Sequence, residues 1–151
     1  MIALGSDHAG FALKQEIRKY LESKGYKVKD FGTGGVGSVD YPDFGLAVAE
    51  AVAKGECDRG IVICGTGIGI SISANKVPGV RAALCTDTTM ARLSREHNDA
   101  NVLALGERIV GVSVALDIVD TWLETAFLKD RHTRRVGKIA EIENKYSKKC
   151  N

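Results

Sequence analysis

Short runs of apolar residues alternate along this chain with longer segments in which apolar residues recur every three or four positions. The short runs have the length and composition of buried strands, and the longer segments place their apolar residues on one face, as amphipathic helices do. The predicted strands cover residues 1–6, 26–31, 60–64, 80–85 and 102–105. The predicted helices cover residues 11–24, 43–54, a segment after residue 69 that ends at 76, 87–96, a long segment after residue 111, and 135 to about 147.

Because strands and helices alternate, the strands are expected to run parallel, since each parallel connection needs a crossover segment. The expected architecture is an α/β sandwich of three layers, in which helices cover both faces of a five-stranded parallel sheet. The sequence has no internal repeat, low-complexity tract or linker, so residues 1–151 are predicted to form one domain.

The last predicted helix, at about 135–147, has no strand after it. Its apolar residues form one stripe, made of Val136, Ile139, Ile142 and Tyr146. An additional helix of this kind packs either on its own sheet or on a neighbouring subunit. The pattern alone leaves both possibilities open.

Charge and hydropathy exclude several classes of partner. The formal net charge is +2, and it gives no reason to expect binding to nucleic acid or to an anionic membrane. Basic residues gather only at 129–135, either as a solvated helix start or as part of an anion site. No apolar segment approaches the length of a membrane span, and the N-terminus does not resemble a signal peptide, so a cytoplasmic location is expected.

The four cysteines form no CxxC pair and suit a reducing compartment. Cys57, Cys85 and Cys150 are expected to be inert buried thiols or simply exposed ones. Cys64 differs, because it ends a predicted strand and lies just before a helix start, where a thiol's pKa is lowered. We therefore predict a functional role for Cys64. The three histidines occur in no HxH or HxxxH arrangement, so no metal site is expected.

In an open parallel sheet, ligands bind beyond the carboxyl ends of the strands where the strand order reverses. The first and third predicted strands end at Ser6 and Cys64. In a 2-1-3-4-5 strand order these two strands are neighbours at the switch point. Asp7, His8 and Cys64 are therefore predicted to share one crevice.

Residues 65–69, Gly-Thr-Gly-Ile-Gly, form a glycine-rich turn between the third strand and the next helix. Such a turn can direct backbone amides at an anion or an oxyanion, or it can simply allow tight packing of helix on strand. It is neither a dinucleotide fingerprint nor an NTPase phosphate loop, because its glycine spacing differs and it lacks the Lys-Ser/Thr pair.

Two other polar segments have a structural explanation beside a functional one. Asp7 is a reasonable cap for the helix that follows it. Residues 97–101, His-Asn-Asp-Ala-Asn, could be only a polar turn before the fifth strand.

Five segments together resemble the signature of type B ribose-5-phosphate isomerases, within the ribose/galactose isomerase family that also includes galactose-6-phosphate isomerase subunits. The resemblance extends from Met1 to about Tyr146 and implies a Rossmann-like fold and no metal or other cofactor. It also implies a homodimer or tetramer whose active site is shared between subunits. The segments are residues 6–10, 64–69, 74–76, 97–101, and Arg131 and His132 with Arg135.

The resemblance also implies roles for individual residues. Cys64 matches the base that transfers the proton, and His97 matches the group that opens the sugar ring. Thr66 matches the enediolate-stabilising loop together with the amides of Gly65, Gly67, Ile68 and Gly69. The remaining matches are substrate contacts: Asp7, His8, Asn98, Arg108, Arg131 and Arg135.

The expected reaction is the interconversion of ribose 5-phosphate and ribulose 5-phosphate through an enediolate. It needs a base, stabilisation of a negative oxygen, a group that opens the ring and a phosphate site, and each has a candidate. Two alternatives remain open: isomerisation of a six-carbon aldose phosphate such as allose or galactose 6-phosphate, and a sugar-phosphate sensor without catalysis.

Overall fold

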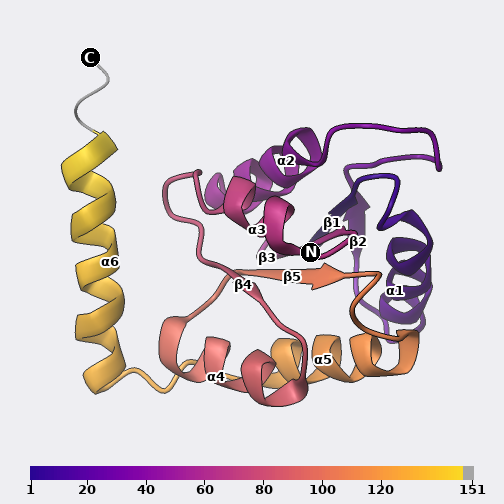
Figure 1. Cartoon of the computed structure of the whole chain (residues 1–151). Helices are drawn as coiled ribbons and strands as arrows, with labels where there is room; N and C mark the ends of the chain where they lie inside the picture. The colour runs from indigo at the N-terminus through magenta and orange to yellow at the C-terminus, as the bar shows by residue number, and fades with distance from the viewer. Residues whose placement is uncertain (148–151) are drawn as a thin grey trace.

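The predicted alternation of strands and helices is present in the computed structural model of the chain, which describes residues 1–147 (Figure 1). Cys150 lies outside these described residues. The strands are β1 (Ile2–Ser6), β2 (Val28–Asp30), β3 (Arg59–Cys64), β4 (Ala82–Leu84) and β5 (Val102–Gly106). The helices are α1 (Phe11–Ser23), α2 (Tyr41–Ala53), α3 (Ile68–Ala74), α4 (Thr88–Asn98), α5 (Val112–Glu124) and α6 (Arg131–Ser147).

The five strands form one parallel sheet in the order β2-β1-β3-β5-β4. β1 and β3 are neighbours as predicted, but the predicted 2-1-3-4-5 order is wrong at the far edge, where β5 lies beside β3 and β4 takes the edge. Burial explains the exchange. All five residues of β5 are buried, as a central strand requires, whereas the three residues of β4 are only partly buried.

Helices cover both faces of the sheet, as the three-layer prediction required. α2 and α3 pack on one face, and α1, α4 and α5 pack on the other (Figure 1). Because successive side chains of a strand point to opposite faces, β5 contributes Leu103 and Leu105 to one core and Val102 and Ala104 to the other. The two cores hold the sheet rigid beneath the loops at its two ends.

α6 stands apart from the sheet and contacts mainly α4 (Figure 1). It begins at Arg131, four residues before the predicted start, directly after Lys129 and Asp130 turn the chain with positive φ angles of 61° and 46°. Of its described residues only His132 is buried. The apolar stripe is uncovered in the single chain, with Ile142 60% and Tyr146 58% exposed. Within residues 1–147, no helix has the length and apolar character needed to cross a bilayer.

Candidate active site

The carboxyl ends of β1 and β3 open into a pocket of about 470 Å³. The register that pairs Ser6 with Ile63 brings the residues that follow the two strands together. The predicted crevice shared by Asp7, His8 and Cys64 is therefore present. The pocket is lined by Asp7, His8, Ala9, Tyr41, Cys64, Gly65, Thr66, Ile68, Gly69 and Arg108.

Cys64 lies at the floor of this pocket, with only 4% of its surface exposed. Its Sγ accepts a hydrogen bond of 3.1 Å from the amide of Gly67. Gly67 has a φ of +79°, a left-handed conformation that glycine adopts without strain, and this conformation turns the loop back over the sulfur. The sulfur is thus held as a hydrogen-bond acceptor at the floor of the pocket.

The loop above Cys64 presents further polar groups to the pocket. The Thr66 Oγ1 accepts a hydrogen bond of 3.2 Å from the amide of Ile68, which leaves the hydroxyl proton able to donate. The guanidinium of Arg108 lies against Gly65, where an added Cβ would be only 3.2 Å from an Arg108 nitrogen. The pocket therefore combines a buried sulfur with the positive charge of Arg108.

His8 and Asp7 are both fixed by backbone amides. The Nδ1 of His8 accepts a hydrogen bond of 3.2 Å from the amide of Val39, so a neutral His8 carries its proton on Nε2. An Asp7 carboxylate oxygen accepts a hydrogen bond of 3.0 Å from the amide of Gly10, just before α1. The predicted helix cap is therefore wrong, because Gly10 is the N-cap of α1 and no side chain caps that helix start. Asp7 instead holds the turn before α1, and the same side chain lines the pocket.

Tyr41 is a pocket residue that the sequence analysis missed. Its ring lies so close to Gly69 that an added Cβ there would be 2.6 Å from the tyrosine Cζ. The only signal in the sequence was its position before Pro42 at a helix start, which carries no information about the pocket. The contact depends on how α2 packs on α3.

His97, Asn98, Arg131 and Arg135 do not line the Cys64 pocket. His97 and Asn98 end α4, ahead of the amino end of β5, whereas Cys64 pairs with Gly106 at the carboxyl end of β5. The four steps along β5 correspond to about 13 Å. Within one chain, the predicted site residues therefore form two groups at opposite ends of the sheet.

The second group is organised around two stacked histidines. The rings of His97 and His132 are parallel within 12°, and their centroids are 4.3 Å apart. Burial, with the charges of His97, Arg131 and Arg135, lowers the pKa of His132. The sequence pattern could not reveal this contact, because it joins the end of α4 to the start of α6.

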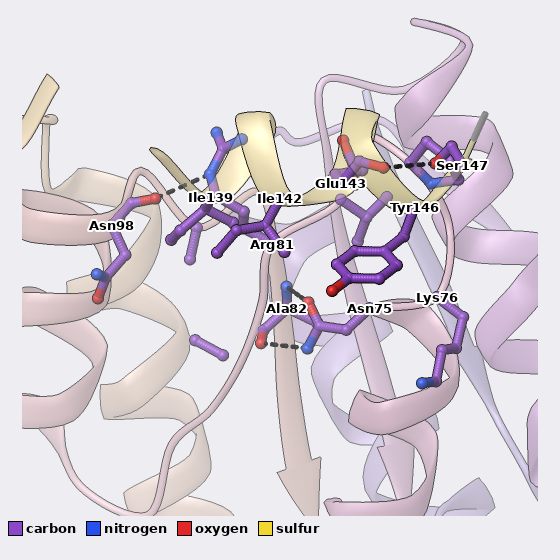
Figure 2. Close-up of a pocket in the computed structure, with 14 residues that line it drawn as sticks. Asn75, Lys76, Arg81, Ala82, Asn98, Ile139, Ile142, Glu143, Tyr146 and Ser147 are labelled. Carbon is purple, nitrogen blue, oxygen red and sulfur yellow. Dashed lines mark hydrogen bonds between the residues drawn. The ribbon is translucent and has the colours of Figure 1, made fainter. Parts of the chain in front are cut away.

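A cavity of about 600 Å³, the α6 cavity, separates α6 from the edge of the sheet. Figure 2 shows Ile139, Ile142 and Tyr146 pointing from α6 toward Ala82, with Asn98 at one end of the cavity. Its other wall includes Asn75, whose side chain exchanges two hydrogen bonds with the backbone of Ala82. The stripe and the cavity together leave an apolar surface beside Asn98.

The other described cysteines lie in the cores. Burial raises the pKa of Cys85 to about 11 and also raises the pKa of Cys57, so both thiols are disfavoured as thiolates. In residues 1–147, no group of three or more His, Cys, Asp or Glu side chains is placed to hold a metal ion.

Comparison with known proteins identifies the family of the chain. A family model described as Ribose/Galactose Isomerase matches residues 2–139. Ribose-5-phosphate isomerase B of Escherichia coli is 51% identical over 144 residues, which cover 95% of this chain and 97% of that protein. A galactose-6-phosphate isomerase subunit of Clostridium acetobutylicum is 45% identical over 146 residues, covering 95% and 84% respectively. The solved structure of Clostridium thermocellum ribose-5-phosphate isomerase B has a TM-score of 0.96 and 70% identity, covering 96% of this chain and 98% of that one.

Proposed function

Because the chain belongs to the ribose/galactose isomerase family of sugar-phosphate isomerases, we propose that it interconverts ribose 5-phosphate and ribulose 5-phosphate. The observation that carries the proposal is the thiol of Cys64 at the floor of a pocket, beneath a loop whose amide donates to it. An aldose becomes a ketose when a base moves the proton from C2 to C1 and the hydroxyl proton of O2 passes to O1. Cys64 is the proposed base.

The enediolate formed between these two steps carries negative charge on oxygen. The loop of residues 65–69 supports its stabilisation, because the Thr66 hydroxyl can donate and the Arg108 guanidinium lies against Gly65. One donor aimed at such an oxyanion contributes roughly 3–4 kcal/mol to transition-state stabilisation. Asp7 and His8 are the proposed contacts of the sugar hydroxyls, His8 through the proton on Nε2.

The remaining roles belong to the second group. His97 is proposed to open the sugar ring, Asn98 to contact the substrate, and Arg131 and Arg135 to bind the phosphate. Since this group lies at the opposite end of the sheet from Cys64, we infer that the working site forms between two copies of the chain. The uncovered stripe of α6 and the α6 cavity beside Asn98 are the surface proposed for the second copy.

The decisive experiment measures ketose formation from ribose 5-phosphate with excess chelator for the wild type, Cys64→Ala and Cys85→Ala. Positioned proton transfer typically raises the reaction rate about 100- to 10,000-fold. The kcat of Cys64→Ala is therefore expected to fall at least about 100-fold. Cys85→Ala removes an equally buried thiol outside the pocket and should remain active. A folded Cys64→Ala variant with full turnover would exclude Cys64 as the base.

A six-carbon aldose phosphate is the second candidate substrate, favoured by the similarity to a galactose-6-phosphate isomerase subunit. The two candidates are separated by measuring kcat/KM of the same protein for ribose 5-phosphate, allose 6-phosphate and galactose 6-phosphate. A clear preference for a six-carbon sugar would overturn the ribose proposal while keeping the base. Binding without turnover of any of these sugars would favour the sensor.

A further inference from the structure

The stacked histidines join the two elements that carry the second group of site residues. His97 is in the last turn of α4 and is partly exposed, while His132 is in the first turn of α6 and is 5% exposed. Their ring centroids are 4.3 Å apart. A flat buried ring beneath a partly exposed one restricts how the outer ring can turn. The contact with His132 therefore restricts the orientation of His97.

Most of the charges that act on His132 in its own chain are positive. Arg131 and Arg135 both act on His132, and only Asp130 acts in the opposite direction. A second positive charge on a ring 4.3 Å away would add to this repulsion, so the pair resists holding two protons. Burial first, and then these positive charges, favour the neutral form of His132 when no anion is bound.

The carboxylates of α4 do not offset these arginines, because each is already in an ion pair. Glu96 pairs with Arg92 at 2.9 Å. Asp99, at the end of the helix, pairs with Arg95 at 2.9 Å and with Arg81 at 3.3 Å. An anion on Arg131 and Arg135 would therefore remove part of what disfavours a protonated His132, while the burial of its ring remains.

We propose that His132 is a positioning residue that holds His97 near Arg131 and Arg135, so that the pair takes up one proton when a doubly charged anion binds these arginines. The proposal rests on the proposed function for identifying that anion as the phosphate of the sugar. A bound dianion cancels the repulsion from the arginines and favours the protonated form of a nearby imidazole. His97 would then become a ring-opening acid only when substrate is present.

Sulfate tests the coupling without any sugar, because its two charges do not titrate near neutral pH. The imidazole proton signals of the wild type, His132→Phe and His132→Ala are followed by NMR against pH, with and without saturating sulfate. An opposite charge within a few ångström shifts a pKa by about one to three units, so the midpoint of His97 should rise by about one unit with sulfate. His97→Gln and His132→Phe identify the two signals by their loss.

The two variants of His132 separate positioning from simple packing. His132→Phe keeps a flat ring against His97 and should retain the response to sulfate, whereas His132→Ala should lose most of it. Calorimetry of sulfate binding in two buffers of different ionisation enthalpy counts the proton independently. Circular dichroism and sedimentation confirm that each variant keeps its fold and oligomeric state.

The proposal would be overturned if sulfate bound without shifting the titration midpoint of either histidine. It would also be overturned if sulfate shifted the midpoint of His97 equally in His132→Ala and the wild type. Because no turnover is measured, the result is independent of the substrate. A protein that responds to sulfate but does not isomerise ribose 5-phosphate would contradict the proposed function and leave the coupling intact. Turnover with no sulfate-linked proton uptake would contradict only the coupling.

Discussion

At the scale of single residues, the chemistry of the pocket depends on where one amide points. Gly67 directs its N–H to the Cys64 sulfur from a left-handed conformation, and its Cα lies directly against β4 and β5. An added Cβ would be 2.6 Å from a Leu84 methyl and 2.8 Å from the Leu105 carbonyl carbon. The Leu105 carbonyl is backbone of a central strand and cannot yield as a flexible side chain could, so a larger residue would displace the loop itself and this position requires glycine.

Gly67→Ala is therefore expected to move the loop off the sulfur and to lower kcat at least about tenfold, as loss of an aligned donor does. The control is Gly55→Ala, because Gly55 has a similar φ of +74° with no atom within 4 Å of an added Cβ. Both variants carry left-handed strain, but only the first disturbs the pocket. Equal activity in the two variants would contradict the role of the amide.

At the scale of elements, α1 is tied to the edge of the sheet by a buried lysine. Lys14 is 1% exposed, and its Nζ donates to Asp30 at 2.7 and 2.9 Å and to the Thr33 carbonyl at 2.6 Å. This contact joins α1 to β2 and to the loop that leads to Val39, the partner of His8. The Lys14 contact therefore supports the loop that holds His8 at the pocket.

Lys14→Ala should lower the free energy of unfolding by about 3 kcal/mol, because it removes one partner of a buried ion pair. Urea denaturation measures the change. Lys19→Ala, on the same helix but with a side chain 73% exposed, should change stability by less than about 0.5 kcal/mol. A similar loss of unfolding free energy in both variants would contradict the stabilising role of the Lys14–Asp30 pair.

The contact between α4 and α6 should weaken in acid. The pKa of folded His132 lies below the ordinary value of 6.5, mainly through burial, so the unfolded chain binds a proton more readily. Stability from this group is present above pH 6.5 and is lost as the pH falls below it. His132→Phe should therefore lose less stability than the wild type between pH 7 and pH 5 in thermal unfolding. An equal loss of stability in both proteins over this pH range would show that His132 does not cause the acid destabilisation.

At the scale of the whole molecule, the proposed active site needs a second copy of the chain to bring its two groups of residues together. Mixing Cys64→Ala with His97→Ala tests this directly, because a mixed dimer contains one site with both wild-type residues. Random exchange should restore about a quarter of the wild-type activity, since about half the dimers are mixed and each has one intact site. Two inactive variants that stay inactive after proven exchange would contradict the shared site.

The apolar pattern by itself determined the elements and much of the Cys64 pocket. Periodicity is a local property, so strands and helices were predicted to within a few residues, and the rule for parallel sheets brought Asp7, His8 and Cys64 together. Among the strands, the least accurate boundaries are those of β2 and β4, which are each shorter than predicted and lie at the two edges of the sheet. Edge strands have fewer neighbours to hold their ends in the ladder.

Only the tertiary structure decided how these elements are arranged and which residues meet across them. The place of β5 beside β3 follows from its complete burial against both helical layers, which depends on every other element. The His97–His132 stack and the Tyr41–Gly69 contact join residues far apart in the sequence through helix packing. The separation of His97 from Cys64 has the same origin, because it depends on the direction of β5 and not on any local pattern.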